Sequence, residues 1–248
     1  MSEDRRVVRR QDHEIRRLAS QTKEDYATPR RRPLNIVRCL QSGTILTCRG
    51  RKSLDYRVVD DAEMGMDDGK TEFTSDSVII SVRRGVHQNA IWGDGRSRMT
   101  LAHELAHGVL HYGDPLYRES GASGTMSTPR LRLEDSAEHQ AKVFASAFLI
   151  DDVVVEELTS PDEVSVEFLV SYEAACICFD RVHRAKHRRE EGAERVRLAN
   201  ERFQADMRPR EQHQLAYSAQ ACPECQTNML RISFGLLCLE CGYSENSE

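Results

Sequence analysis

The chain of 248 residues carries 35 basic and 40 acidic side chains, which gives a net charge of -5. This length allows one catalytic domain plus a small appendage, and the charge balance excludes a surface built as a whole for nucleic-acid or membrane binding. No segment approaches the ~20 apolar residues of a membrane span, and the start lacks the apolar stretch of a secretory signal. We therefore expect a cytoplasmic protein whose cysteines do not form a disulfide framework.

The first 33 residues form a charged N-terminal arm. Residues 13–26 are compatible with a helix, and the prolines within 28–33 break that helix and mark a boundary. The arm is rich in arginine, but a solvated surface explains such a charge run more simply than phosphate binding does. Direct contact with nucleic acid therefore stays open.

Residues 34–158 are predicted to form one domain that mixes strands and helices. Up to residue 92 the sequence consists mostly of short β-branched runs separated by turn residues. Strands are predicted at 44–47, 56–59 and 77–82. From Met99 onward, apolar residues recur with helical spacing until the glycine and proline of 113–115. A second helix, rich in alanine and phenylalanine, is predicted at about 135–150.

Two further parts follow this domain. Residues 159–218 are predicted to be a helical extension, in which the charged stretch 181–216 is solvated. Residues 219–248 change character and form a cysteine module. The expected fold class is α+β, with a small mixed or antiparallel sheet packed on the two helices and a separate C-terminal module.

The helix that begins near Met99 contains the pattern His-Glu-x-x-His at residues 103–107. On an α-helix, His103 and His107 lie one turn apart on the same side, and Glu104 falls in the same sector. Two neutral imidazoles so spaced can bind one zinc ion, and the glutamate beside them can act as a base toward water. Because the rest of the helix is apolar, these polar groups would be costly to bury without a metal. We predict a catalytic zinc with ligands His103 and His107 and with Glu104 as the catalytic acid/base.

The third protein ligand has to come from another part of the chain. His111 lies two turns from His103, too far for all three rings to reach one ion. On the second helix, Glu138 shares the core-facing stripe with two alanines, which favours it as the third ligand. The alternatives are Asp135, Glu134 and His139. Asp135 is predicted to share the helix face of Glu138 one turn earlier, so it is also a candidate to hold a ligand imidazole in its tautomer.

Two runs of sequence carry a family resemblance. They are Arg98-Met-Thr-Leu-Ala-His-Glu-Leu-Ala-His-Gly-Val-Leu-His111 and Glu138-His-Gln-Ala-Lys-Val-Phe-Ala-Ser-Ala-Phe-Leu-Ile150. The HExxH pattern alone is weak, but its combination with a downstream Glu-x-x-Ala-x-x-Phe-Ala is specific. Together they resemble the ImmA/IrrE family of metallopeptidases, and the resemblance spans roughly residues 34–182.

The resemblance implies a zincin-like fold and a zinc-dependent endopeptidase. Such an enzyme would cleave a helix-turn-helix repressor and so derepress its target genes. The resemblance also implies His103, His107 and Glu138 as zinc ligands and Glu104 as the catalytic acid/base. The sequence departs from the family at 148–151, where Phe-Leu-Ile-Asp replaces the common Leu-Leu-Met-Pro. The cysteine module is a second departure, and it leaves the partner in doubt.

Two other functions remain open from the sequence. One is a non-catalytic binding or regulatory module with a vestigial metal site. The other is the toxin of a two-gene module that a helix-turn-helix partner neutralises. For the enzyme, the group that stabilises the oxyanion is not assigned by the sequence, and the candidates are Tyr112, Tyr117 and His87.

The cysteine module contains two Cys-x-x-Cys pairs. They are formed by Cys222 with Cys225 and by Cys238 with Cys241. Four thiolates so spaced fit a tetrahedral zinc ion, and residues 229–234 supply a strand between the pairs. We predict a zinc ribbon at 219–248 whose structural zinc provides most of its folding free energy. Its one basic residue, Arg231, favours a protein partner over phosphate.

Overall fold

The computed structural model describes residues 5–26, 33–114, 132–207, 217–232 and 235–246. The chain divides into two compact units, Met1–Lys186 and His187–Glu248. Within the described ranges, no helix combines the length and apolar character needed to cross a membrane.

The described residues form both helices and strands. In chain order these are α1 (Asp12–Asp25), α2 (Ile36–Leu40), β1 (Thr44–Thr47), β2 (Gly50–Val59), α3 (Asp61–Met64), β3 (Gly69–Phe73), β4 (Ser77–Arg83), α4 (Arg84–Ile91), α5 (Gly95–His111), the 3-10 helix η1 (Leu133–Asp135), α6 (Ala137–Leu149), α7 (Asp152–Val155), α8 (Pro161–Phe168), α9 (Tyr172–Met207), β5 (Tyr217–Ala221), β6 (Asn228–Ile232), β7 (Gly235–Leu237) and β8 (Ser244–Asn246). The predicted α+β class is confirmed.

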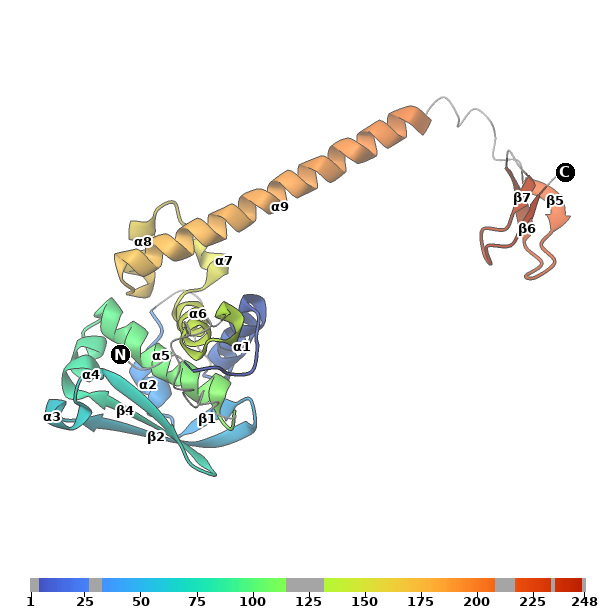
Figure 1. Ribbon diagram of the computed structural model, residues 1–248. Coiled ribbons are helices and arrows are strands. Elements are labelled where there is room, and N and C mark those ends of the chain that lie inside the picture. Colours follow the sequence, from blue (N-terminus) through green and yellow to red (C-terminus); the bar gives the residue numbers. More distant parts are fainter. Residues whose placement is uncertain (1–4, 27–32, 115–131, 208–216, 233–234, 247–248) are drawn as a thin grey trace, which may run out of the picture. The chain divides into compact units, whose positions relative to one another are not determined.

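The sheet of the first unit is mixed, with strand order β1-β2-β4-β3. β2 pairs antiparallel with β1 and parallel with β4, and β3 pairs antiparallel with β4. In β4 the alternate residues Val78, Ile80 and Val82 are fully buried, so the strand has one apolar face. α5 packs on this sheet (Figure 1). The approach is so close that a Cβ atom on Gly108 would lie 2.9 Å from Ile45 Cδ1, so a larger residue there would require the end of the Ile45 side chain to shift.

The helices of the first unit form layers on the sheet. α6 packs against α5 on one side and against α1 on the other (Figure 1). Leu101 and Leu105 of α5 and Phe144 and Phe148 of α6 are fully buried in this core. The rings of Phe144 and Phe148 stack with their centroids 5.7 Å apart. α5 and α6 are therefore held in a fixed relation by apolar packing over much of their length.

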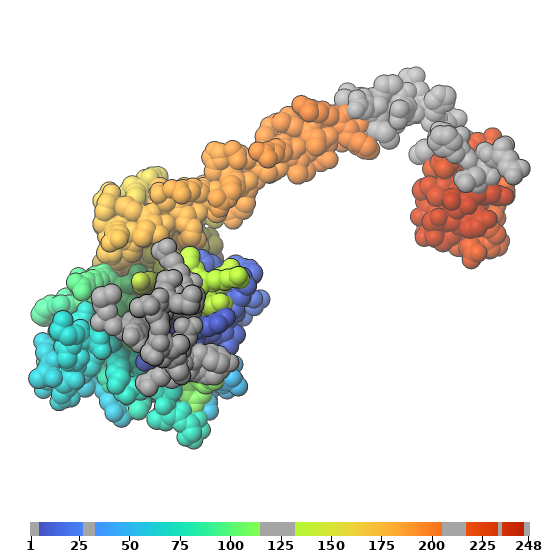
Figure 2. All heavy atoms as spheres, viewed as in Figure 1, coloured from blue at the N-terminus to red at the C-terminus, as the bar shows by residue number. Residues whose placement is uncertain are grey.

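Residues 5–10, which we call the N-terminal strap, run along the segment that precedes α6. The amide of Val7 donates to the carbonyl of Asp135 at 2.9 Å, and the amide of Ala137 donates to the carbonyl of Arg5 at 3.0 Å. In the space-filling view, blue N-terminal residues adjoin the yellow-green residues of this segment (Figure 2). The strap thus adds main-chain hydrogen bonds at the start of α6.

The prediction that residues 34–92 consist mostly of short strands is only partly correct. This range also contains the helices α2 and α4, and β3 was not predicted. In α2, four of the five residues are buried, and the Asn35 side chain accepts a hydrogen bond from the amide of Arg38 at 3.0 Å. Burial and this cap outweigh the β-branched composition. β3 reads as Gly-Lys-Thr-Glu-Phe, which has too few β-branched residues to signal a strand.

In the second unit, β5, β6, β7 and β8 form a separate antiparallel sheet in that order. The small core of this sheet contains Cys222, Met229 and Cys238, all buried. Residues 187–204 of α9 are exposed throughout, as expected, but the stretch 181–216 is not solvated at its start, where Val182 is buried and His183 Nε2 lies 3.2 Å from the Val155 carbonyl oxygen.

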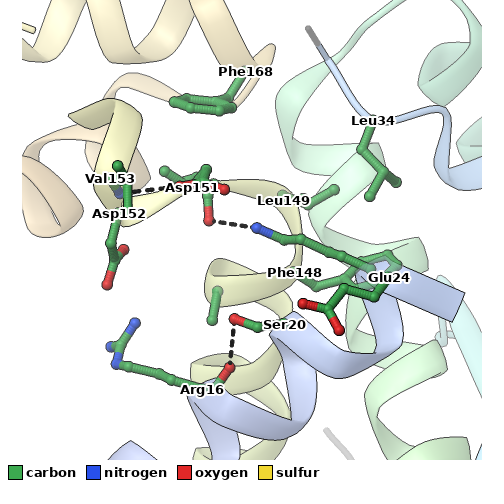
Figure 3. Close-up of a pocket in the computed structure, with 13 residues that line it drawn as sticks. Arg16, Ser20, Glu24, Leu34, Phe148, Leu149, Asp151, Asp152, Val153 and Phe168 are labelled. Atoms are coloured by element: carbon green, nitrogen blue, oxygen red, sulfur yellow. Dashed lines mark hydrogen bonds between the residues drawn. The ribbon is translucent and has the colours of Figure 1, made fainter. Parts of the chain in front are cut away.

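A cavity of about 230 Å³ lies between α1 and the C-terminal end of α6. Figure 3 shows the Arg16 guanidinium and the Asp152 carboxylate facing one another beside it. The Lys23 ammonium group donates to the Ile150 carbonyl at 2.9 Å. No lining residue comes from the HExxH segment, so this cavity is distinct from the candidate site below. Asp152 also accepts two hydrogen bonds from Arg181, at 2.8 and 2.5 Å.

We expect Asp152→Asn to lower the free energy of unfolding by about 1 kcal/mol at pH 7, because it removes the charge from a bidentate, partly exposed ion pair. Burial raises the pKa of Asp152, but the hydrogen bonds and charge of Arg181 outweigh burial, so the pKa is lowered overall. Such a carboxylate stabilises the fold above its unfolded-state pKa and loses this contribution as the pH falls through its folded pKa.

The difference between wild type and variant is therefore expected to shrink below about pH 4. Urea unfolding followed by circular dichroism at several pH values measures this difference. Asp180→Asn is the matched control, because the pair of Asp180 with Arg184 is mostly exposed and contributes little. A constant difference between pH 7 and pH 3 would contradict the assignment.

Candidate metal centre

The cluster forms where α5 meets the first turn of α6. The Asp94 side chain caps α5 by accepting from the amide of Ser97 at 2.8 Å. The Ser136 side chain caps α6 by accepting from the amide of His139 at 3.0 Å. Glu138 therefore lies in the first turn of a helix, where the helix dipole favours a carboxylate.

The structure brings the side chains of His103, His107 and Glu138 together. His103 Nε2 lies 3.1 Å from both His107 Nε2 and Glu138 Oε2, and His107 Nε2 lies 3.6 Å from Glu138 Oε1. Ligand atoms held at about 2.1 Å in a tetrahedral arrangement are about 3.4 Å apart. The three distances, two of which end at different oxygens of Glu138, are close to this separation, and this group can hold a metal ion.

The electrostatics of the cluster favour the forms of these side chains that bind metal. Burial lowers the pKa of His107 to about 3, so the ring is neutral. The hydrogen bond with His103 lowers the pKa of Glu138, so this side chain is a carboxylate. The neutral His107 ring and the Glu138 carboxylate direct lone pairs at one small volume beside His103, and a cation in that volume would satisfy them.

Glu104 lies next to this cluster and is held by β3. Its Oε2 atom accepts a hydrogen bond of 2.7 Å from the Thr71 hydroxyl, which also lies 2.9 Å from the Glu104 main-chain oxygen. Glu104 is only 8% exposed. Burial raises its pKa, which the Thr71 hydrogen bond partly offsets. A raised carboxyl pKa suits a group that both takes and releases a proton.

A close contact of β3 also fixes the position of Glu104. A Cβ atom on Gly69 would lie 2.7 Å from Glu104 Cγ, so a larger residue at position 69 would displace this side chain. Sequence reasoning missed both Gly69 and Thr71. The sequence of β3 did not indicate a strand. The contact of β3 with Glu104 exists only because the sheet packs on α5.

His111 is the second feature that sequence reasoning left without a role. Its Nδ1 atom lies 3.0 Å from His107 Nδ1, on the side of that ring opposite to the metal cluster. Its Nε2 atom lies 3.3 Å from Gln140 Oε1. His111 is 3% exposed, and burial lowers its pKa to about 4. The four-residue spacing between His107 and His111 is the sequence pattern that could have indicated the contact between the two rings.

The alternative third ligands lie outside the cluster. Asp135 pairs with Arg6 at 3.9 Å, Glu134 pairs with Arg9, and His139 Nε2 lies 3.0 Å from Asp12 Oδ1. The prediction that Asp135 shares the helix face of Glu138 is wrong, because α6 begins only at Ala137 and Asp135 belongs to η1.

The candidate oxyanion groups gain no support. The Tyr112 hydroxyl lies 3.0 Å from the Thr74 carbonyl oxygen and 2.5 Å from that of Ser75, so it is engaged within the fold. His87 Nδ1 lies 2.8 Å from the Tyr56 hydroxyl. Tyr117 lies outside the described residues. The group that stabilises an oxyanion therefore stays unassigned.

A second cluster occupies the C-terminal unit. Cys222, Cys225, Cys238 and Cys241 place their sulfur atoms within 4.8 Å of one another, and this group also can hold a metal ion. The Sγ atoms of Cys222 and Cys241 are 3.5 Å apart, and those of Cys225 and Cys238 are 3.3 Å apart. The Thr227 hydrogen bond lowers the pKa of Cys238 to about 6, which favours the thiolate that metals bind. The cluster fits the predicted zinc ribbon.

Residues 64–179 match the family model of the IrrE N-terminal-like domain of peptidase family M78. This part of the chain is similar to that family. The matched range includes α5, α6 and the whole first cluster, and it lies within the range 34–182 expected from the sequence. The resemblance to the ImmA/IrrE family is thereby confirmed, and it supports a metallopeptidase that acts on protein. None of the curated proteins matches the chain.

We expect Gly69→Ala to lower the free energy of unfolding by about 1–3 kcal/mol, because the added methyl group overpacks the contact with Glu104. Gly85→Ala is the matched control. A Cβ atom there meets nothing within 4 Å, and the residue lies in α4, so we expect a gain of about 0.5–1 kcal/mol. Chemical denaturation measures both, and equal effects would refute the proposed contact.

We expect Cys238→Ser to remove about one zinc ion per chain and to unfold the ribbon, because the metal supplies most of its folding free energy. Elemental analysis measures the metal, and limited proteolysis followed by mass spectrometry locates the cuts. Cleavage is expected to concentrate within residues 217–246 while the first unit persists. Cys176→Ser, outside the cluster, is the control. Unchanged metal content in Cys238→Ser would contradict the ribbon.

Proposed function

We propose that this protein is a zinc-dependent endopeptidase whose catalytic zinc is held by His103, His107 and Glu138. The supporting observation is the convergence of the two Nε2 atoms and the Glu138 carboxylate at 3.1–3.6 Å, within a peptidase M78 domain. Two imidazoles and one carboxylate are a known donor set of zinc peptidases. Three protein ligands leave the fourth position of a tetrahedral zinc for water or substrate.

In this proposal Glu104 is the catalytic acid/base. A bound zinc ion would supply Lewis acidity, which polarises a carbonyl group and makes water easier to deprotonate. Glu104 takes the proton from the attacking water and delivers it to the leaving amine. The Thr71 hydroxyl and the close contact with Gly69 hold this carboxyl in place between the two transfers.

An extended peptide has a natural docking edge beside Glu104. β3 pairs with β4 on one side and is the last strand of the sheet among the described residues. The free edge of such a strand offers main-chain donors and acceptors that a peptide can use by adding a strand. Because Gly69 and Thr71 belong to β3 and contact Glu104, a peptide bound along this strand would lie near the catalytic group.

The proposed substrate is a helix-turn-helix repressor, whose cleavage would derepress its target genes. This part rests on the family resemblance, and it is compatible with the open edge of β3. The second zinc, held by Cys222, Cys225, Cys238 and Cys241, is proposed to be structural. With Arg231 as its one basic residue, the ribbon suits a protein partner better than a phosphate backbone.

We expect Glu104→Gln to reduce repressor cleavage by a factor of about 10²–10⁴ without loss of bound zinc, because it removes the base but none of the ligands. Purified helix-turn-helix repressors from the same genome are incubated with the enzyme, with and without chelator, and cleavage is followed by mass spectrometry. Glu190→Gln, exposed on α9, is the control and is expected to cleave as wild type does. Chelator-resistant cleavage, or full activity of Glu104→Gln, would refute the proposal.

Two outcomes would favour the other functions considered from the sequence. If repressor control in cells survives Glu104→Gln but is lost in Cys238→Ser, the protein acts as a binding module with a vestigial site. If expression of the protein alone arrests growth and a helix-turn-helix partner relieves the arrest, the protein is the toxin of a two-gene module.

A further inference from the structure

A buried row of hydrogen bonds leads from His107 to the N-terminal strap. It passes from His107 to His111 and then to Gln140, whose side chain is fully buried. Gln140 contacts the main chain at Val8 in the strap and at Glu134 before α6. None of these contacts involves the metal-facing atoms of the cluster.

The orientation of the Gln140 amide follows from its neighbours. Gln140 Nε2 lies 2.9 Å from the Val8 carbonyl oxygen and 2.7 Å from the Glu134 carbonyl oxygen. Carbonyl oxygens only accept, so the amide nitrogen must face them and donate to both. Gln140 Oε1 therefore faces the other way, where the Arg10 guanidinium donates to it at 3.3 Å. All four hydrogen-bonding positions of the amide are then used.

This orientation determines where the imidazole protons lie. Gln140 Oε1 can only accept, so His111 must carry its proton on Nε2 and donate at 3.3 Å. A neutral His111 ring then has an unprotonated Nδ1 atom, which accepts from His107 Nδ1 at 3.0 Å. With its proton on Nδ1, the neutral His107 ring has a free lone pair on Nε2. That atom is the one directed at His103 and Glu138.

We infer that His111 and Gln140 are positioning residues, which hold the His107 ring in place with its Nε2 lone pair directed at the metal. The inference rests on the proposed metal site and adds to it the groups that orient one ligand. The N-terminal strap belongs to the same arrangement, because the Val8 carbonyl and Arg10 fix the Gln140 amide. Arg10 also pairs with Asp114, directly after α5, at 3.4 Å.

Metal affinity tests the inference independently of peptide cleavage. His111→Phe keeps a ring but removes both nitrogens, and partners that orient a ligand typically contribute a factor of about 10–100 in affinity. We expect the dissociation constant for Co²⁺ at the histidine-carboxylate site to rise by about this factor. His111→Asn offers an oxygen near the place of Nδ1 and is expected to restore much of the affinity. His139→Asn, whose ring pairs with Asp12 instead, is the control and is expected to bind as wild type does.

The measurement uses full-length protein whose thiolate cluster keeps zinc. Competition with a chelator gives the Co²⁺ dissociation constant, and the intense thiolate-to-cobalt bands reveal any Co²⁺ that enters the ribbon. A second measurement on zinc-loaded wild type does not depend on any variant. Long-range ¹⁵N–¹H spectra of histidine-labelled protein are expected to show His111 protonated on Nε2 and not on Nδ1.

The outcomes separate this inference from the proposed function. Wild-type affinity in a folded His111→Phe variant, or a proton on His111 Nδ1, overturns the inference while the peptidase proposal stands. If wild type binds Co²⁺ only through the thiolates, the metal site itself fails. If His111→Phe does not fold, as judged by circular dichroism, the position of the proton in wild type decides.

Discussion

The first unit depends on the meeting of two helices in an apolar interior where ligand atoms face one another. His103, His107 and Glu138 are partly buried on α5 and α6, which otherwise pack together largely through buried leucine, alanine and phenylalanine side chains. Burying such groups without a partner costs several kcal/mol each, on the order of 2–7 for a neutral polar group. Apolar packing between α5 and α6 therefore has to offset the cost of removing these side chains from water. A shared cation would lower that cost.

The sheet sets the other boundary of the site. α5 approaches β1 and β4 closely because Gly108 has no side chain, and β3 approaches Glu104 closely because Gly69 has none. The Glu104 carboxyl is thus confined between a helix and an edge strand. Thr71 adds a hydrogen bond that a purely apolar strand could not provide. These contacts restrict the conformations of the Glu104 side chain and hold it in a defined position near the cluster.

The parts of the site that the sequence predicted are those set by local periodicity. His103, Glu104 and His107 share a helix face whatever the fold, and Glu138 lies on the core-facing stripe of its own short helix. The strands β1 and β4 were recognisable from β-branched runs, and the cysteine pairs from their spacing. Each of these patterns can be recognised within a short segment of the chain, without knowledge of the tertiary structure.

What the sequence did not predict depends on contacts between distant segments. Gly69 and Thr71 matter only because β3 packs on α5, and Gln140 matters only because the N-terminal strap passes α6. The helix face of Asp135 was predicted wrongly because the helix was expected to begin at residue 135, two residues before the start of α6 at Ala137. Four-residue spacing identified His111 as a neighbour of His107, but its role depends on the Gln140 amide.

The two clusters differ in the chemistry of their donor atoms, which has a consequence for oxidative conditions. Sulfur donors in the ribbon lie 3.3 and 3.5 Å apart in pairs, so a mild oxidant can join them and thereby expel their metal. Imidazole and carboxylate donors have no comparable reaction. Peroxide stress would thus dismantle the four-cysteine cluster and spare the cluster of His103, His107 and Glu138, so that one metal centre could persist in a chain that has lost the other.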